Sequence, residues 1–308
     1  MPRAVLIAGP TASGKSGLAL DLAEELGGIV INADSMQVYR ELRVLTARPS
    51  VADEARAPHA LYGSVDGSDA YSAGRYVADA KRVLDEAQKS RRLPIFVGGT
   101  GLYFKALIEG LSPIPPVAED VRAFWRREAA EKGAAHVFAQ LTARDSEMAG
   151  RLAPGDTQRI VRALEVIDST GQSLAEWQRL PREPVLDLAE TLPLLVMPER
   201  AELVQRVDRR FDEMIRIGAL DEVAQLDRLG LDPKLPIMGA LGVGPLRRHL
   251  AGTLSLDEAV EAGKVESRQY SKRQVTWARG NMISWKRLNA QEMERERNKI
   301  VRFIQSRD

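Results

Sequence analysis

The sequence contains no cysteine, which excludes disulfides, thiolate zinc sites, iron–sulfur clusters and a cysteine nucleophile. It contains only three histidines, which leaves little for a histidine metal cluster. No apolar run approaches the ~18 residues that a membrane span needs, and the apolar stretch at residues 4–8 is too short for a signal peptide. We therefore expect a cytoplasmic protein without a membrane partner.

An excess of charge of one sign is also missing. The 308 residues include 44 Lys and Arg against 43 Asp and Glu, which gives a formal net charge of +1. This balance excludes a histone-like coat of positive charge, but it does not exclude a local basic face. With 44% hydrophobic and 28% charged residues, the chain has the composition of a globular protein that is long enough for two domains.

Short apolar runs alternate with helical patterns along the first part of the chain. Three of these runs are strand-like: residues 4–8, 29–33 and 94–97. Between the first two, Leu18, Leu22 and Leu26 recur at helical spacing before Gly27, which is a typical left-handed end of a helix. This alternation predicts an α/β fold with a P-loop-type parallel sheet flanked by helices.

The middle of the chain lacks this alternation. Prolines at 113, 115 and 116 interrupt the pattern, and residues 117–180 contain helical segments without a convincing strand. The apolar run at 192–197 indicates a return to the sheet, so we predict an all-helical insertion. The predicted segments are residues 1–116 and 185–308 for the two parts of the α/β core, with basic C-terminal helices in the second, and residues 117–184 for the helical domain.

The strongest motif joins the first strand to the first helix and matches G-x-x-x-x-G-K-[ST]. Its residues are Gly9, Pro10, Thr11, Ala12, Ser13, Gly14, Lys15 and Ser16. Glycines let backbone N–H groups converge on phosphate oxygens, the lysine supplies positive charge, and the Ser16 hydroxyl can ligate Mg²⁺. The motif predicts a phosphate site, but it does not name the reaction.

Two polar positions follow the next strands, at the edge where α/β sheets bind ligands. Asp34 follows the second run and could ligate Mg²⁺, accept a proton from a substrate amine, or cap the next turn. The third run ends in Gly98-Gly99-Thr100-Gly101 rather than in the aspartate of a typical P-loop nucleoside triphosphatase. These glycines indicate either a close approach of another group or only a tight turn.

Basic residues are concentrated late in the chain, where seven of them lie between Lys264 and Arg287 against one acid. Such a stripe suits a phosphate backbone, although a charged helix face is often only solvated. Arg206 and Arg210 are spaced for one helix face and could reach a ligand phosphate. Their spacing favours instead ion pairs with Asp208 and Glu213, the alternative that we predict from these residues alone.

Together these residues resemble the bacterial tRNA dimethylallyltransferase (tRNA isopentenyltransferase) family over nearly the whole chain. Its motifs are matched, in order, by residues 9–16, 34–40, 71–73, 98–103, 158–166 and 272–277. The resemblance implies transfer of a dimethylallyl group from its diphosphate to N6 of the adenosine immediately 3′ of the anticodon. It also implies that the P-loop holds the diphosphate, with Lys15, Mg²⁺ on Ser16, and Arg206 neutralising its charge.

The resemblance further implies residue roles and partners. Asp34 orients the adenine amine and takes its proton, and Thr100 lies beside the reacting groups. The implied tRNA-contacting positions are Asp34, Ser35, Met36, Gln37, Thr100, Arg122, Gln158, Arg159, Ile160, Val161, Arg162, Arg268, Lys272 and Arg273. The helical insertion would grip the anticodon stem, and we expect the chain to act as a monomer.

Some positions depart from the family pattern, and other functions stay open. Leu45, Ala60, Val243 and Ala278 replace residues that are usual in the family, which affects the expected loop geometry and tRNA selectivity rather than the chemistry. The alternatives are prenylation of free adenine nucleotides, a P-loop small-molecule kinase, and a non-catalytic RNA-binding protein. The first would use AMP as acceptor, and the second would consume ATP.

Overall fold

A computed structural model of the chain describes residues 2–306 and divides into two compact units. The first combines the residues up to Ile108 with those from Val185 onward, and the second is Glu109–Pro184. The second unit therefore begins before the boundary expected at residue 117. The physical reason is that Ile114 and Val117 pack into the core of the helical unit, so the proline-rich stretch belongs to it.

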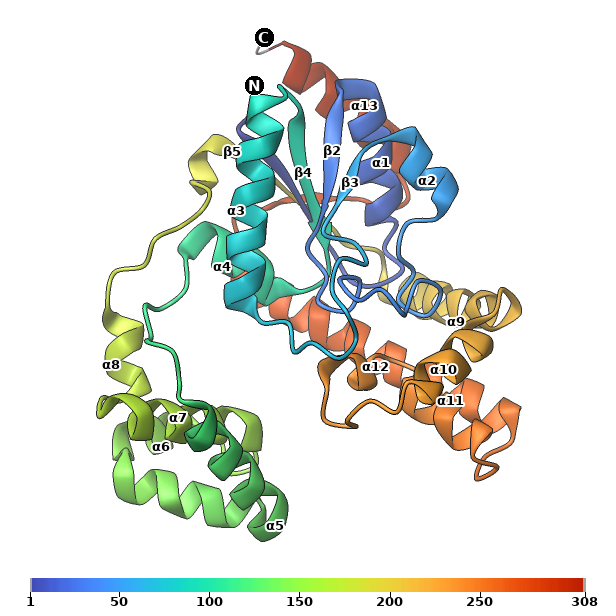
Figure 1. Cartoon of the computed structure of the whole chain (residues 1–308). Coiled ribbons are helices and arrows are strands. Elements are labelled where there is room, and N and C mark those ends of the chain that lie inside the picture. Colours follow the sequence, from blue (N-terminus) through green and yellow to red (C-terminus); the bar gives the residue numbers. More distant parts are fainter. Residues whose placement is uncertain (1, 307–308) are drawn as a thin grey trace. The chain divides into compact units, whose positions relative to one another are not determined.

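The first unit contains an all-parallel, six-stranded sheet in the order β3-β2-β4-β1-β5-β6 (Figure 1). The strands are β1 (Ala4–Ala8), β2 (Gly28–Asn32), β3 (His59–Ala60), β4 (Leu93–Gly98), β5 (Thr191–Val196) and β6 (Lys286–Leu288). The predicted fold class is confirmed, and the four apolar runs form the four central strands. The two edge strands were not predicted, because two or three residues are too few to show a periodic pattern.

Helices cover both faces of this sheet (Figure 1). On one face lie α1 (Lys15–Leu26), α2 (Val51–Arg56) and α13 (Met293–Gln305), and on the other lie α3 (Ala73–Lys89) and α4 (Gly101–Glu109). The predicted helix end at Gly27 is confirmed, since this residue has φ 63° and its N–H bonds back to Ala23. Both faces of β1 are buried, which explains its uninterrupted apolar sequence.

A further group of helices lies at the carboxyl ends of the strands (Figure 1). It contains α9 (Arg200–Arg216), α10 (Ala219–Arg228), α11 (Val243–Leu250) and α12 (Leu256–Asn281), with the short turn η2 (Pro236–Gly239) between α10 and α11. Another short turn, η1 (Leu188–Glu190), leads directly into the amino end of β5. A capping box begins α12, where Ser255 and Glu258 exchange side-chain to backbone hydrogen bonds. These helices build a core of their own against the loop that follows β2.

The second unit is entirely helical in its regular structure. It consists of α5 (Glu119–Arg144), α6 (Ser146–Arg151), α7 (Thr157–Thr170) and α8 (Leu174–Arg179). Trp125 is almost fully buried in its core, and α7 contributes a stripe of buried residues that includes Ile160 and Leu164. Within residues 2–306, no helix is long and apolar enough to cross a membrane.

Candidate active site

The P-loop connects β1 to α1 and bends in a way that only certain residues allow. Gly14 has φ 91°, a left-handed conformation that glycine adopts without strain, whereas Ala12 holds φ 60° despite its side chain. A Cβ at Gly9 would lie 2.7 Å from the carbonyl oxygen of Val196 on β5. The Ser13 hydroxyl is buried, and no hydrogen-bond partner for it lies among residues 2–306. The loop therefore carries a strained backbone and an unsatisfied polar atom, both of which are common at ligand sites.

Lys15 begins α1 with its side chain buried beneath the loop. Its Nζ donates a hydrogen bond to the carbonyl oxygen of Pro10 at 3.1 Å. Burial and, to a lesser extent, the charge of Arg210 lower the pKa of Lys15 to about 8, while Asp34 opposes that shift. The charged form of buried Lys15 has lost its water shell and lies near the charge of Arg210. A bound anion would stabilise this charged form in place of water.

Asp34 lies at the carboxyl end of β2 in a turn fixed by the buried Asn32. The Asn32 amide accepts a hydrogen bond from Asp34 N at 2.8 Å and donates to Asp34 O at 2.9 Å. Asp34 Oδ1 accepts a bond from Met36 N at 2.9 Å, so the turn-capping interpretation is correct for this oxygen. Within residues 2–306, Oδ2 has no hydrogen-bond partner. One carboxylate oxygen therefore orients the group, and the other remains available to a substrate.

The glycines at the carboxyl end of β4 allow close approach of two neighbouring elements. A Cβ at Gly98 would lie 2.0 Å from the carbonyl oxygen of Ala33, and one at Gly101 would lie 2.2 Å from the Trp277 ring on α12. Close packing, rather than only a tight turn, thus explains this run. Thr100 Oγ1 accepts a hydrogen bond from Ser35 N at 3.0 Å, which ties the β4 turn to the Asp34 turn.

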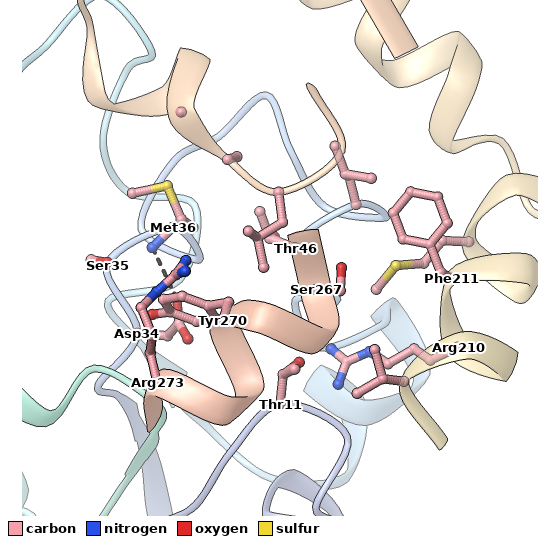
Figure 2. Close-up of a pocket in the computed structure, with 16 residues that line it drawn as sticks. Thr11, Asp34, Ser35, Met36, Thr46, Arg210, Phe211, Ser267, Tyr270 and Arg273 are labelled. Atoms are coloured by element: carbon pink, nitrogen blue, oxygen red, sulfur yellow. Dashed lines mark hydrogen bonds between the residues drawn. The ribbon is translucent and has the colours of Figure 1, made fainter. Parts of the chain in front are cut away.

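A cavity of about 280 Å³ opens beside these residues, and we call it the Asp34 cavity (Figure 2). Its polar lining includes Thr11, Asp34 and Arg210, and its apolar lining includes Leu45, Met36, Val207, Phe211, Met214 and Ala240. Figure 2 shows Asp34, Tyr270 and Arg273 together on one side of it, with Arg210 and Phe211 across from them. A cation, a P-loop residue and apolar walls in one cavity fit a small apolar group joined to an anion.

A second cavity of about 300 Å³ shares Tyr270 and Arg273 with the first, and we call it the Thr100 cavity. Thr100, Leu102, Phe104 and Trp277 contribute to its walls, and Tyr270 lines both cavities. Burial, followed by the charge of Asp34, raises the pKa of Tyr270 to about 12, while a hydrogen bond with Thr100 opposes the shift. The phenol therefore stays protonated and can donate a hydrogen bond between the two cavities.

Arg210, on α9, is a site residue, although its spacing favoured an ion pair within the protein over a ligand contact. It lines the Asp34 cavity and is partly buried, and burial lowers its pKa while Asp34 opposes the shift. Within residues 2–306 it forms no ion pair or hydrogen bond. The predicted pairing with Asp208 or Glu213 is wrong, because these two carboxylates bind Arg268 and Arg216 instead.

Arg206 lies one turn earlier on α9 and has a different environment. Its Nη2 lies 2.5 Å from Glu202 Oε1 within the same helix, and a Cβ at Gly14 would lie 3.9 Å from its Nη1. Arg206 is therefore next to the P-loop, but its charge is already paired. Its role toward a diphosphate stays a prediction.

The loop that contains Leu45 is held by a carboxylate from a distant helix. Glu222 on α10 accepts hydrogen bonds from the backbone N–H groups of Arg43, Val44 and Leu45, at 2.6, 2.8 and 2.8 Å. Leu45 itself is buried and contributes to the wall of the Asp34 cavity. The sequence offered no signal for this contact, because Glu222 is far from the loop in the chain.

The late basic stripe lies on α12, and part of it is neutralised by α9. Lys264 Nζ lies 2.6 Å from Asp212 Oδ1, and Arg268 lies 2.9 Å from Asp208 and 2.6 Å from Glu261. Lys272 and Arg273 have no ion pair among the described residues, and the Arg273 guanidinium stacks on the Tyr270 ring at 5.6 Å. Of the three α12 residues predicted to contact tRNA, Lys272 and Arg273 therefore carry charges that no acid of the described residues neutralises. Arg268 instead joins α12 to α9.

The predicted tRNA positions of the helical unit differ in exposure. The side chains of Ile160 and Val161 are buried in its core, and the prediction that these positions contact tRNA stays a prediction. Gln158 and Arg159 are exposed, and Arg162 is partly buried near Glu165. Arg122 is partly buried and lies 2.9 Å from Glu119. Residues 158–162 do not all face the same way, because a helix cannot expose consecutive residues on one face.

The residues present fit a magnesium ion that is held mainly by its substrate. Ser16 is exposed in the first turn of α1, where its hydroxyl can ligate a cation. Within residues 2–306, no three His, Asp or Glu side chains are grouped to hold a metal. Mg²⁺ commonly keeps several waters and binds through one or two protein ligands plus phosphate oxygens, so a single hydroxyl is sufficient beside a diphosphate.

Sequence and structure comparisons give consistent results. The family model described as IPP transferase matches residues 37–281, and one described as isopentenyl transferase matches residues 2–60. The chain is 54% identical to the tRNA dimethylallyltransferase of Parvibaculum lavamentivorans, over 98% of this chain and 96% of that protein. It is 56% identical to the tRNA dimethylallyltransferase of a Bradyrhizobium species, over 90% and 91% of the two chains.

Solved structures give the same picture. The tRNA isopentenylpyrophosphate transferase of Bacillus halodurans is similar with a TM-score of 0.69 and 30% identity, over 98% of this chain and 96% of that one. A eukaryotic dimethylallyltransferase acting on tRNA is similar with a TM-score of 0.78 and 26% identity, over 93% of this chain and 73% of that one.

Proposed function

The chain belongs to the IPP transferase family, and we propose from this premise that it transfers a dimethylallyl group to N6 of the adenosine that follows the anticodon in tRNA. The donor is dimethylallyl diphosphate, and the reaction is a prenyl transfer. The observation that carries the proposal is the position of Asp34 and Arg210 in one cavity beside Thr11 of the P-loop. One cavity therefore holds Asp34, which can accept a proton from the adenine amine, and Arg210, which can neutralise the leaving diphosphate.

The donor diphosphate binds at the P-loop. Its oxygens accept hydrogen bonds from backbone N–H groups of the loop and from the Lys15 ammonium, and Arg210 neutralises further charge. Mg²⁺, held by the Ser16 hydroxyl, supplies additional charge neutralisation when it is bound. The apolar walls of the Asp34 cavity, Phe211 and Met214 among them, exclude water from the dimethylallyl group.

Asp34 acts on the acceptor. An adenine amine is a weak nucleophile because its lone pair is delocalised, so a carboxylate that orients it and accepts its proton is useful. Asp34 Oδ2 accepts the N6 proton as the bond from N6 to the allylic carbon forms. The allylic carbon–oxygen bond breaks, and diphosphate leaves with the bonding electron pair. The target adenine reaches Asp34 only after it leaves the stack of neighbouring nucleobases.

The tRNA is bound by basic and polar side chains, which we assign for each unit by itself. In the first unit these are Lys272 and Arg273 of α12, with Ser35, Met36 and Gln37 beside the target base, and in the helical unit they are Arg122, Gln158 and Arg159. One chain supplies every residue proposed for the reaction, so we further propose that the enzyme acts as a monomer. Because its proposed substrate is tRNA, we also propose that it acts in the cytoplasm.

Nucleoside mass spectrometry tests the proposed function. Unmodified tRNA with adenosines on both sides of the target is incubated with the enzyme, Mg²⁺ and dimethylallyl diphosphate. We expect N6-dimethylallyladenosine at the position that follows the anticodon. Prenylation of AMP in place of tRNA, or consumption of ATP without prenyl transfer, would establish one of the alternative functions instead.

The pKa of Lys15 predicts how donor binding depends on pH. Because this pKa is lowered to about 8, the ammonium is present below pH 8 and is lost as the pH rises above it. The dissociation constant of pyrophosphate should therefore increase above pH 8, measured by calorimetry with Mg²⁺. Lys15→Met serves as the control, because the ionisation of pyrophosphate itself is common to both proteins. If both proteins show the same pH dependence, Lys15 is not the titrating group.

A further inference from the structure

One side chain of α12 reaches the P-loop and the turn after β4 at the same time. Gln274 Oε1 accepts a hydrogen bond from Thr11 N at 2.8 Å, and its Nε2 donates one to the carbonyl oxygen of Gly99 at 2.9 Å. Both contacts join residues that are far apart in sequence. A single amide group therefore links the loop that binds the leaving diphosphate to the turn that carries Thr100.

The contact with Gly99 leaves no space for any other residue at that position. A Cβ at Gly99 would lie 2.1 Å from Gln274 Nε2, and the next nearest atom outside that side chain is the Gly9 carbonyl oxygen at an ordinary 3.4 Å. The backbone of Gly99 is not in the left-handed region, so alanine is allowed there in every other respect. The absent side chain of Gly99 makes room for the Gln274 amide.

Both partners of this amide belong to segments that need an external support. Thr11 precedes Ala12, whose left-handed conformation is strained and persists only where neighbouring contacts hold it. Gly99 precedes Thr100, whose hydroxyl holds the turn of Asp34 through Ser35 N. A shift at either end would change the spacing between the diphosphate and the carboxylate.

We propose that Gln274 is a positioning residue of the transferase reaction. It holds the P-loop and the Thr100 turn at the separation that places the allylic carbon between diphosphate and adenine amine. The inference rests on the proposed function for the identity of the reaction. It differs from a tRNA-contact role of α12, because Gln274 acts through the backbone of Thr11 and Gly99.

Two substitutions of Gln274 separate hydrogen bonding from packing. Gln274→Met keeps the length of the side chain and loses both hydrogen bonds, whereas Gln274→Ala loses both properties. For each we expect kcat to fall by roughly 10-fold to 100-fold, since small misplacements of reacting groups have effects of this size. Pyrophosphate should also bind more weakly, while tRNA should bind with nearly unchanged affinity. Gln269→Ala, at an exposed position of the same helix, should resemble the unmodified enzyme.

A substitution on the partner side tests the same contact independently. Gly99→Ala should displace the Gln274 amide and reproduce the kinetic defect of Gln274→Ala. The double variant should be no worse than either single variant, because both changes break one interaction. Circular dichroism and thermal unfolding, measured on every variant, identify any that fails to fold.

Three results would overturn the inference. Normal turnover in Gln274→Met would show that packing, not hydrogen bonding, matters. Additive defects in the double variant would show that the two substitutions have separate effects. A loss confined to tRNA affinity would make Gln274 a tRNA contact. The proposed function is judged separately. If the unmodified enzyme forms no N6-dimethylallyladenosine, that function fails, whereas the pyrophosphate affinities of the variants still test the positioning role.

Discussion

Asp34→Asn should lower kcat by roughly 10²-fold to 10⁴-fold, the range expected when a general base is removed. The asparagine side-chain oxygen can still accept the hydrogen bond from Met36 N that Asp34 Oδ1 accepts at 2.9 Å. The turn should therefore keep its shape while the basic oxygen is lost. Because tRNA and pyrophosphate bind through other groups, their dissociation constants should change little.

The measurement is single-turnover transfer of the dimethylallyl group to tRNA, with both binding constants determined in parallel. Asp34→Ala adds a useful comparison, because it also removes the hydrogen bond to Met36 N and should weaken tRNA binding in addition. Asp85→Asn, an exposed change on α3, is the matched control for loss of one negative charge. If Asp34→Asn transfers at the normal rate, another group takes the N6 proton.

The proximity of Asp34 to the P-loop could be predicted from the sequence, because both follow strands of one parallel sheet. Carboxyl ends of parallel strands meet at one edge, so Asp34 and Lys15 had to lie near each other once the strands were recognised. The same reasoning identified the edge that carries Thr100. Short-range patterns were sufficient for these residues because the sheet itself supplies the long-range geometry.

Contacts made by side chains from distant helices could not be predicted in this way. Glu222 binds three backbone N–H groups of the loop before Thr46, and Gln274 joins Thr11 to Gly99. The residues next to Glu222 and Gln274 in the sequence do not predict either contact. Such contacts depend on how α10 and α12 pack at the end of the sheet. Helical periodicity states which face is buried, but it does not state against what.

The two arginines of α9 illustrate the limit of spacing arguments. Arg206 and Arg210 share one helix face, and the sequence could not decide which is paired within the protein and which is left for a ligand. The structure pairs Arg206 with Glu202 and leaves Arg210 at the Asp34 cavity. The two acids expected to pair with Arg210 bind other arginines. Asp208 binds Arg268 of α12, and Glu213 binds Arg216 at the end of α9.

Arg210→Met should therefore lower kcat/KM for dimethylallyl diphosphate by roughly 10²-fold to 10³-fold, as expected for loss of a preorganised charge at the leaving group. The methionine keeps much of the apolar volume, so the cavity should not collapse. Arg206→Met should have a smaller effect, because removal of Arg206 leaves Glu202 unpaired at a partly exposed position while Arg210 still faces the donor.

Initial rates at varied donor concentration, with saturating tRNA, distinguish the two arginines, and Arg209→Met at an exposed neighbouring position is the control. A dominant loss in Arg206→Met would mean that the Glu202 pair opens when the donor binds and that Arg206 turns toward Gly14. The charge nearest the leaving group would then come from a residue released by the substrate. With a dominant loss in Arg210→Met, it comes instead from an arginine that the fold already holds unpaired at the cavity, and the site is preorganised for the anion that the reaction releases.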